Sequence, residues 1–323
     1  MAIASINGIA IANIAEINGI TEANVAKLNT LIALVATGNS AIFGYGNSGQ
    51  SMSNKVSNSG VVAADTSGVG TARNRLAAAG YGGDKALFGY GYGGPRVSIT
   101  NLVSNSGVVA TDTTGVGTAR MSLAAAGYGG DKAIFGYGDD GNYASMTNKV
   151  SNSGVVATDT SGVGKTRNHL AAAGYGTDKA IFGYGYGANP GGGPQSLTNK
   201  VSNTGAVSAD TTGVGSARIG LAAAGYGGDK AIFGYGEGTG GSNLSMTNLV
   251  SNSGVVAADT TGVGSGRRWL AAAGYGDDKA IFGYGQISST SKITNLVSNS
   301  GVVATDNTGV GTDRYQLAAA SYG

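Results

Sequence analysis

The chain has 323 residues, of which 60 are glycine and 12% are charged, with a formal net charge of +2 and no cysteine. So small a charge argues against a nucleic-acid partner or an anionic membrane, and the lack of cysteine excludes a disulfide framework and a thiolate metal site. No run approaches the roughly 18 apolar residues that span a bilayer, so membrane insertion is not expected.

Residues 1–40 differ in composition from the rest of the chain. Two related motifs, INGIA at 6–10 and INGIT at 17–21, recur at a spacing of eleven residues. The segment has no basic stretch at its start, and polar residues interrupt its apolar part, so it does not resemble a Sec signal peptide.

The second half of this segment predicts a short helix over residues 22–36. Thr21 is a good N-cap, and Val25, Leu28 and Ile32 follow at helical spacing. So short a helix is marginal alone, which favours a docking or oligomerisation stalk in a homo-oligomer. The segment resembles the N-termini of some bacteriophage virion proteins, including tail fibres. That resemblance implies other virion proteins as partners of residues 1–40 and a location on the virion.

Six near-copies of one segment of about 47 residues fill the chain from residue 41 to its end. A repeat of this length indicates a stack or ring of small supersecondary units, none of which buries a core alone. All six phenylalanines of the chain mark the copies: Phe43, Phe88, Phe135, Phe182, Phe233 and Phe282.

Each copy predicts four strands, here called A to D. LAAAGYG and DKAIFGYG flank a glycine-rich turn and read as a hairpin of strands A and B. TNLVSNSG and GVVATDT, joined at Asn-Ser-Gly or Asn-Thr-Gly, read as strands C and D. The small residues of strand A suit an axis where neighbouring units converge, and the Ile-Phe pair of strand B suits the space between sheets.

The chain enters and leaves the pattern in the middle of a repeat, which favours a closed ring. The first copy begins at strand B (41–46), and the chain ends with strand A (317–323). The predicted fold is therefore all-β: residues 41–323 form a six-bladed β-propeller of four-stranded antiparallel blades, closed by the C-terminal strand and preceded by the short N-terminal helical stalk. A β-solenoid or a fibre is the alternative.

The repeat R-x-x-LAAAGYGGDKAIFGYG resembles the hairpin of kelch-like and galactose-oxidase-type propellers. The resemblance covers residues 41–323 but is loose, because Gly-Tyr-Gly replaces the kelch Gly-Gly pair and the kelch tryptophan near strand D is missing. AIFGYGNSGQ at 41–50 also resembles propellers of the regulator-of-chromosome-condensation type. Neither resemblance implies a specific activity.

The copies differ in two zones. One is the B–C loop, which varies in length and content. The other is a pair of residues between an invariant arginine and the leucine of strand A. These variable pairs are Asn74-Arg75, Met121-Ser122, Asn168-His169, Ile219-Gly220, Arg268-Trp269 and Tyr315-Gln316.

An antiparallel meander brings both zones to the same face, because the end of B, the start of C, the end of D and the start of A share one edge. Tyrosine, tryptophan and arginine dominate recognition sites on rigid scaffolds. The predicted ligand-binding residues are Arg75, Met121, His169, Arg268, Trp269, Tyr315, Tyr92, Tyr143 and Tyr186. Unconstrained drift of exposed loops is the alternative explanation of the variation.

The repeated aspartates invite two interpretations. Each lies eight residues before the repeated arginine, as in Asp65 and Arg73. A structural Asp–Arg link is favoured over calcium binding, because no other oxygen-rich side chains accompany it. The Asp-Lys pairs at the A–B turns read as solvated turns.

We expect a non-enzymatic binding protein that needs no cofactor or metal and recognises a surface glycan or protein receptor. His169 is the only histidine, so there is no second histidine for a metal site, and there is no cysteine nucleophile. Two alternatives stay open. One is a purely structural virion or decoration protein that binds no ligand. The other is a glycan-active enzyme using the carboxylates of Asp139 and Asp140.

Overall fold

The computed structural model describes residues 39–47, 49–188 and 192–323, together with the backbone of four short strands near the N-terminus. The chain divides into two compact units, Met1–Gly38 and Asn39–Gly323. The described residues of both units contain strands and no helix.

The INGIA and INGIT motifs lie in two short antiparallel pairs. β1 (Ser5–Ile6) pairs with β2 (Ile9–Ala10), and β3 (Glu16–Ile17) pairs with β4 (Ile20–Thr21). The described part of this segment is therefore strand, and the predicted helical stalk is wrong there. The helix expected over residues 22–36 lies outside the described residues.

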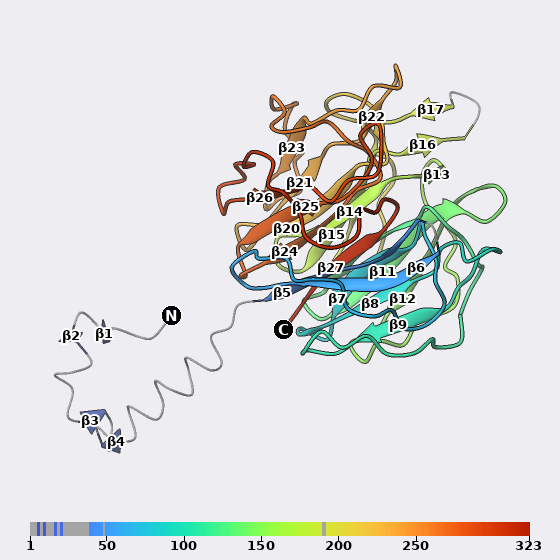
Figure 1. The fold of residues 1–323 in the computed structure, drawn as a ribbon. Helices are drawn as coiled ribbons and strands as arrows, with labels where there is room; N and C mark the ends of the chain where they lie inside the picture. Colours follow the sequence, from blue (N-terminus) through green and yellow to red (C-terminus); the bar gives the residue numbers. More distant parts are fainter. Residues whose placement is uncertain are drawn as a thin grey trace. The chain divides into compact units, whose positions relative to one another are not determined.

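The unit 39–323 contains six three-stranded antiparallel sheets that are built from strands A, B and C of the prediction (Figure 1). In the order A-B-C the sheets are β27-β5-β6, β7-β8-β9, β10-β11-β12, β14-β15-β18, β20-β21-β23 and β24-β25-β26. The A strands are β7 (Ala77–Tyr81), β10 (Ala124–Tyr128), β14 (Ala171–Tyr175), β20 (Ala222–Tyr226), β24 (Ala271–Tyr275) and β27 (Ala318–Tyr322). The B strands are β5 (Ser40–Gly46), β8 (Lys85–Gly89), β11 (Lys132–Asp139), β15 (Lys179–Gly183), β21 (Lys230–Gly234) and β25 (Lys279–Gly283). The C strands are β6 (Gln50–Val56), β9 (Thr100–Val103), β12 (Tyr143–Val150), β18 (Thr198–Val201), β23 (Thr247–Val250) and β26 (Thr294–Val297).

The predicted six-bladed propeller of four-stranded blades is wrong: the sheets have three strands, and none of them is closed or curled. The segment expected to be strand D makes only two isolated bridges to its strand C, as at Val103–Val109 and Thr100–Thr113. Between these bridges the Asn101 side chain donates to the Ala110 carbonyl at 3.0 Å, so a side chain takes the place of a backbone donor. The continuous ladder that defines a strand is thereby interrupted.

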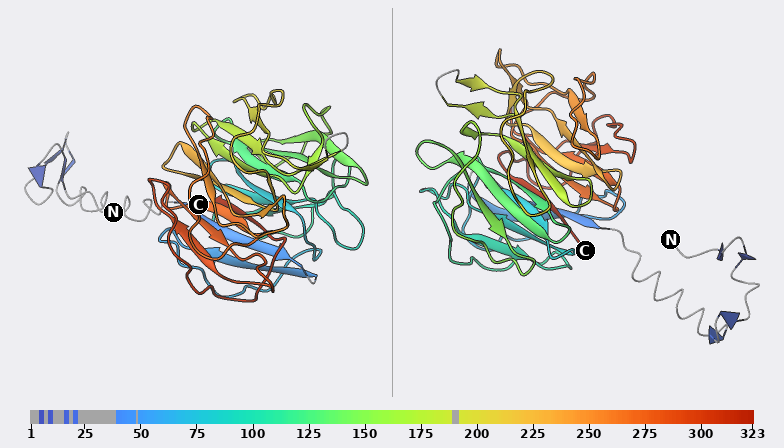
Figure 2. Two further views of the ribbon diagram at one scale, coloured as in Figure 1. Left: turned by 90° about the horizontal axis from the view of Figure 1, so that it is seen from above. Right: turned by 180° about the vertical axis from the view of Figure 1, so that it is seen from behind.

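The C-terminal strand completes the first sheet, as the split of the repeat predicts. β27 pairs with β5 from Ala318–Gly44 to Tyr322–Ser40, and the two strands lie side by side in the views of Figures 1 and 2. Asn39, at the start of this unit, also takes the place of a residue in an A–B turn. Gly276 donates to the Asn39 carbonyl at 2.6 Å, where Gly129 in another repeat donates to the Asp178 carbonyl at 2.7 Å.

The A strands contact one another in a cyclic order, β7, β10, β14, β20, β24, β27 and back to β7. Their small residues permit this close approach: a Cβ added to Gly127 would lie 3.4 Å from the Gly80 carbonyl oxygen of the neighbouring strand. The expectation that strand A lies where neighbouring units converge is therefore confirmed.

The hydrophobic core lies between neighbouring sheets. Phe88 of one sheet packs edge-on against Tyr45 of the preceding one, with ring centroids 5.1 Å apart. Gly44 is required beneath this ring, because an added Cβ would lie 2.6 Å from Phe88 Cζ. In each repeated Phe-Gly-Tyr, the phenylalanine packs against the preceding sheet. The glycine leaves space for the phenylalanine of the following sheet, and the tyrosine packs against that phenylalanine.

Two smaller sheets lie outside these six. β13 (Arg167–Asn168) pairs with β16 (Tyr186–Gly187), which pairs with β17 (Gly193–Pro194), and β19 (Arg218–Ile219) pairs with β22 (Glu237–Gly238). Both join a segment before strand A to a B–C loop, and thus the two variable zones to each other.

Candidate ligand-binding site

Both variable zones lie at the same end of the sheets, as predicted. The first residue of a variable pair bridges to the B–C loop of its own repeat, as in Asn74–Tyr92 and Met121–Asp139. In the first sheet Asn47 and Tyr315 exchange two hydrogen bonds of 2.9 and 2.8 Å. The loops and the pairs therefore form one continuous surface.

The second residue of every variable pair adopts the left-handed conformation, with φ between 51° and 59°. Its backbone N–H donates to the carbonyl of the equivalent residue in the preceding repeat, at 2.6 to 2.9 Å. These six bonds close a ring through Arg75, Ser122, His169, Gly220, Trp269 and Gln316. We call the six variable pairs the ring cluster.

This geometry explains why side chains in the ring cluster vary. A left-handed residue other than glycine is strained, but here the backbone conformation is stabilised by a hydrogen bond on each side. The ring uses only main-chain atoms, so it constrains the backbone and leaves the side chain unconstrained. Six different side chains are therefore displayed from one repeated framework.

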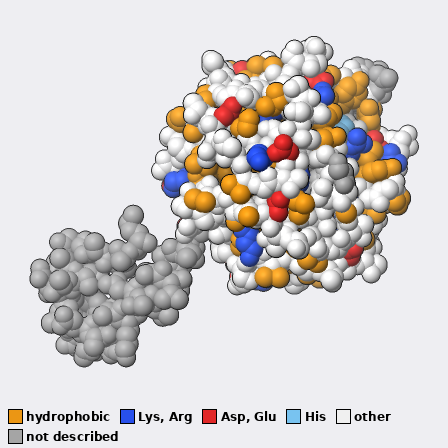
Figure 3. Space-filling model, viewed as in Figure 1, with side chains coloured by type: hydrophobic (Ala, Val, Ile, Leu, Met, Phe, Trp, Pro, Cys, Tyr) orange, Lys and Arg blue, Asp and Glu red, His pale blue; other side chains and the backbone are white. Residues whose placement is uncertain are grey.

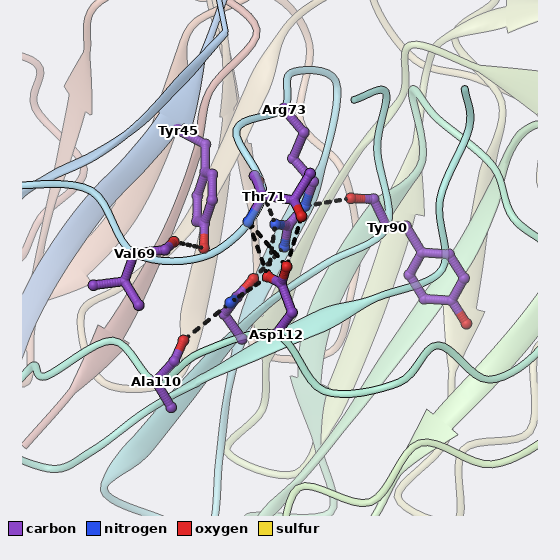
Figure 4. Close-up of polar contacts among 8 residues, drawn as sticks. Tyr45, Val69, Thr71, Arg73, Tyr90, Ala110 and Asp112 are labelled. Atoms are coloured by element: carbon purple, nitrogen blue, oxygen red, sulfur yellow. Dashed lines mark hydrogen bonds and ion pairs between the residues drawn. The ribbon is translucent and has the colours of Figure 1, made fainter. Parts of the chain in front are cut away.

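The invariant arginine before each pair supports the ring through buried hydrogen bonds. Arg73 is fully buried and donates to the Tyr90 carbonyl at 2.8 Å, the Thr71 carbonyl at 3.0 Å and Asn101 Oδ1 at 2.7 Å (Figure 4). Its guanidinium lies over the Tyr45 ring, 4.4 Å from the centroid. A buried charge held by several acceptors gives the adjacent variable pair a rigid support.

The predicted Asp–Arg link exists, but its partner is different. Arg73 lies 3.9 Å from Asp112, which follows strand C of the sheet that Arg73 itself precedes, and not beside Asp65, which is eight residues before it. Asp112 also accepts bonds from Thr71 N and Oγ1 and from Asn101. Burial pushes the pKa of Asp112 upward, but these hydrogen bonds outweigh it and leave the pKa below its ordinary value.

One side of the ring cluster is aromatic. The Trp269 indole stacks on the Tyr315 ring, with centroids 5.6 Å apart at an angle of 29°. The Arg268 guanidinium lies 4.1 Å from the indole centroid and forms an ion pair with Glu237. Gly220 makes room for the indole, because an added Cβ would lie 2.6 Å from Trp269 Cδ1.

The other side of the ring cluster is polar. Arg75 Nη1 lies 3.6 Å from Met121 Sδ, and Ser122 and His169 follow Arg75 around the ring. Burial, reinforced by the charge of Arg75, lowers the pKa of His169 to about 4, against a smaller opposing effect of Asp139. His169 is therefore neutral at pH 7.

Tyr92, Tyr143 and Tyr186 flank the ring cluster, Tyr92 and Tyr186 on B–C connections and Tyr143 at the start of β12. Tyr143 and Tyr186 meet edge to face, with centroids 5.9 Å apart. Tyr92 is 40% exposed, whereas the other eight predicted site residues are partly buried. The structure thus brings six of the predicted residues into the ring cluster and places Tyr92, Tyr143 and Tyr186 around it.

Sequence reasoning missed several members of this surface. Ser122 and Gln316 share the ring with the predicted residues, and Glu237 neutralises Arg268. The one glycine in the second position, Gly220, is the only sequence signal of a left-handed conformation there, and five other residue types obscure it.

The opposite end of the sheets carries the A–B turns and a cavity of about 300 Å³ lined by tyrosines, glycines and five lysines. Each lysine pairs with the aspartate before it, at 2.6 Å for Lys85 and Asp84, and both partners are about 40% exposed. Such pairs contribute little to stability. This geometry agrees with the solvated turns expected there, whereas the cavity was not predicted.

The carboxylates proposed for the enzyme alternative take part in loop structure. Asp139 forms an ion pair with Arg96 at 2.7 Å and accepts the Gly141 N–H, while Asp140 accepts the Asn142 N–H. Within the described residues no group of three His, Cys, Asp or Glu side chains is placed to hold a metal, and no helix is long and apolar enough to cross a membrane.

Comparison with known proteins adds no family assignment, because no family model matches the chain and no curated protein matches it.

Proposed function

We propose that the protein is a non-enzymatic recognition protein that binds a surface glycan through the ring cluster. One observation carries the proposal: a single repeated backbone ring displays six different side-chain pairs, among them the only tryptophan and the only histidine of the chain. A stacked Trp269 and Tyr315 present aromatic surface beside polar groups, the combination that recognition sites use to bind amphipathic ligands.

The position at which the unit 39–323 begins supports this assignment. Asn39, the first residue of the unit 39–323, lines the cavity at the A–B turn end, whereas the ring cluster lies at the other end of the sheets. The unit 39–323 therefore begins at the end away from the ring cluster, and residues 1–40 precede that end in the chain. We propose that this segment attaches the chain to a virion, in keeping with its resemblance to phage virion N-termini. Several copies on one particle would strengthen weak contacts by 10²- to 10⁴-fold.

The test is binding of the full chain to a glycan array and to whole bacterial cells. The double variant Trp269→Ala, Tyr315→Ala removes the aromatic stack, and we expect it to lose at least tenfold in affinity. The matched control is Lys132→Ala, Lys179→Ala at the opposite end, which we expect to bind like the parent.

Three results would contradict the proposal. Equal losses in both double variants would remove the special role of the ring cluster. Binding to protein receptors alone would exclude a glycan ligand. If the folded chain bound to neither array nor cells, the purely structural role would replace recognition.

A further inference from the structure

The ring cluster contains both hydrogen-bond donors and hydrogen-bond acceptors that have no partner. Three donors, Arg75 Nε, Ser122 Oγ and Trp269 Nε1, are buried and have no hydrogen-bond partner. Two acceptors, Asn74 Oδ1 and Asn168 Oδ1, are also buried and have no hydrogen-bond partner. Ser122 and Asn168 are each only 6% exposed. Buried polar groups without partners are costly and uncommon. Five of the ten such side-chain atoms among the described residues lie in the variable pairs, which indicates a site completed by a ligand.

Arg75 differs from the other eight arginines. Among the described residues, each of the others donates to an oxygen atom, as Arg96 does to Asp139 and Arg120 to Asn148. Within the described part of the chain the Arg75 side chain bonds only the sulfur of Met121, and it forms no ion pair with a carboxylate there. Sulfur is a weak acceptor, so the side chain loses little when it turns towards a ligand.

The residues next to Arg75 in the ring do not neutralise its positive charge. Its ring neighbours are Ser122 and Gln316, both uncharged, and His169 beyond Ser122 is neutral at pH 7. Asp139, whose charge acts on His169, is already paired with Arg96. A guanidinium in this setting binds an anionic oxygen group strongly, because it offers a fork of donors and no nearby anion competes for it.

The ring is small enough for one sugar unit to reach both of its sides. Neighbouring backbones joined by a hydrogen bond lie about 5 Å apart, so a ring of six is about 10 Å across. Arg75 and Trp269 are separated in it by Gln316 alone. A ligand that stacks on the indole can therefore extend a charged substituent to Arg75.

Building on the proposed function, we propose that the ring cluster binds an acidic sugar, with the anionic group on Arg75 and Ser122 and the sugar face against Trp269. The sugar hydroxyls, which both donate and accept, satisfy the Asn74 and Asn168 oxygens. A simple anion lacks the face that stacks on the indole, and a neutral sugar leaves Arg75 unpaired.

Trp269 is the only tryptophan of the chain, so its fluorescence reports on this site directly. The full chain is titrated with glucuronic acid, galacturonic acid and N-acetylneuraminic acid, and with glucose, galactose and N-acetylmannosamine as neutral counterparts, at constant ionic strength. We expect at least one acidic sugar to bind at least tenfold more tightly than its counterpart, and sodium acetate to leave the fluorescence unchanged.

Three variants separate the Arg75 contact from general charge. In Arg75→Gln the preference for the acidic sugar should fall below twofold, and Arg75→Lys should restore part of it. Arg96→Gln removes the same charge from a guanidinium that is already paired, and should keep the tenfold preference.

The outcomes distinguish this inference from the proposed function. Neutral sugars that bind as tightly as acidic ones, or an equal loss in Arg75→Gln and Arg96→Gln, would overturn the acidic-sugar assignment while leaving glycan recognition intact. If none of the six sugars changed Trp269 fluorescence although the chain bound glycans on the array, the ligand would lie elsewhere on the surface. Failure on both array and cells would remove the proposed function as well.

Discussion

Arg120 and its five equivalents are the largest fully buried polar side chains of the unit. Arg120 donates to Tyr137 O, Thr118 O and Asn148 Oδ1 and lies over the Tyr90 ring. Replacing it with methionine preserves volume but leaves three acceptors unpaired, of which the Tyr137 carbonyl and Asn148 Oδ1 lie in buried contacts.

We therefore expect Arg120→Met to lower the free energy of unfolding by about 2–4 kcal/mol, measured by urea denaturation. Lys132→Met, which also removes one charge but from a half-exposed side chain, is the control and should leave the midpoint nearly unchanged. Equal shifts in the two variants would show that the buried network has no special role in stability.

His169 makes stability depend on pH. Its pKa is lowered from 6.5 to about 4 in the folded chain, so the unfolded chain takes up the proton first as the pH falls. Stability from this group is complete above pH 6.5 and is lost between pH 6.5 and 4, by up to about 3 kcal/mol.

His169→Asn keeps a polar side chain that tolerates the left-handed conformation but does not titrate. Urea midpoints measured from pH 4 to 7 should fall less steeply for this variant than for the parent. Parallel curves would mean that His169 is freely solvated in the folded chain.

At the scale of the strand, the glycine of Phe-Gly-Tyr determines how closely neighbouring sheets approach. A Cβ added to Gly136 would lie 2.7 Å from Phe182 Cζ of the next sheet, whereas nothing lies within 4 Å of one added to Gly240. We expect Gly136→Ala to cost about 1–3 kcal/mol by overpacking, and Gly240→Ala to be close to neutral, in thermal and urea unfolding. If Gly136→Ala were also neutral, the Phe182 ring would have room to move away.

The strand predictions succeeded where one copy contains all the information and failed where side chains intervene. Strands A, B and C follow from apolar runs and glycine turns, and all six sheets contain them. The segment GVVATDT has the composition of a strand, yet Val108 is 61% exposed and Asn101 occupies part of the ladder. Propensity alone does not show that an asparagine on the neighbouring strand will take the carbonyl.

At the scale of the whole molecule, closure depends on the last seven residues. β27 pairs with β5, and the segment 317–322 contributes Leu317, Ala318 and Tyr322 to two hydrophobic clusters. We expect deletion of residues 317–323 to abolish cooperative unfolding and to cause aggregation, because β5 becomes an exposed edge strand with an uncovered core. Cooperative unfolding of the truncated chain, seen by calorimetry, would contradict a closed cyclic arrangement.

A circular permutant tests the same strand pairing without removing any residue of the sheets. Asn39 and Gly323 make the contacts of an A–B turn, so a short glycine-rich linker between them should be tolerated. With new ends at the turn between Gly130 and Asp131, a permutant of residues 39–323 should keep the sugar-binding fluorescence response of Trp269. Loss of that response in a folded permutant would show that the original ends influence the ring cluster.

The sequence alone determined the number of units, the order of strands A to C, the pairing of the last strand with the first, and the end at which the variable zones meet. These features depend on the repeat period and on residue types within one copy. Only the tertiary structure decided which repeat supplies the aspartate for Arg73, and that Arg75, Ser122 and His169 belong to one hydrogen-bonded ring. The physical reason is that the copies are nearly identical in sequence. Their residue types therefore do not show whether a contact forms within a repeat or between neighbouring repeats, and side-chain packing determines which of the two occurs.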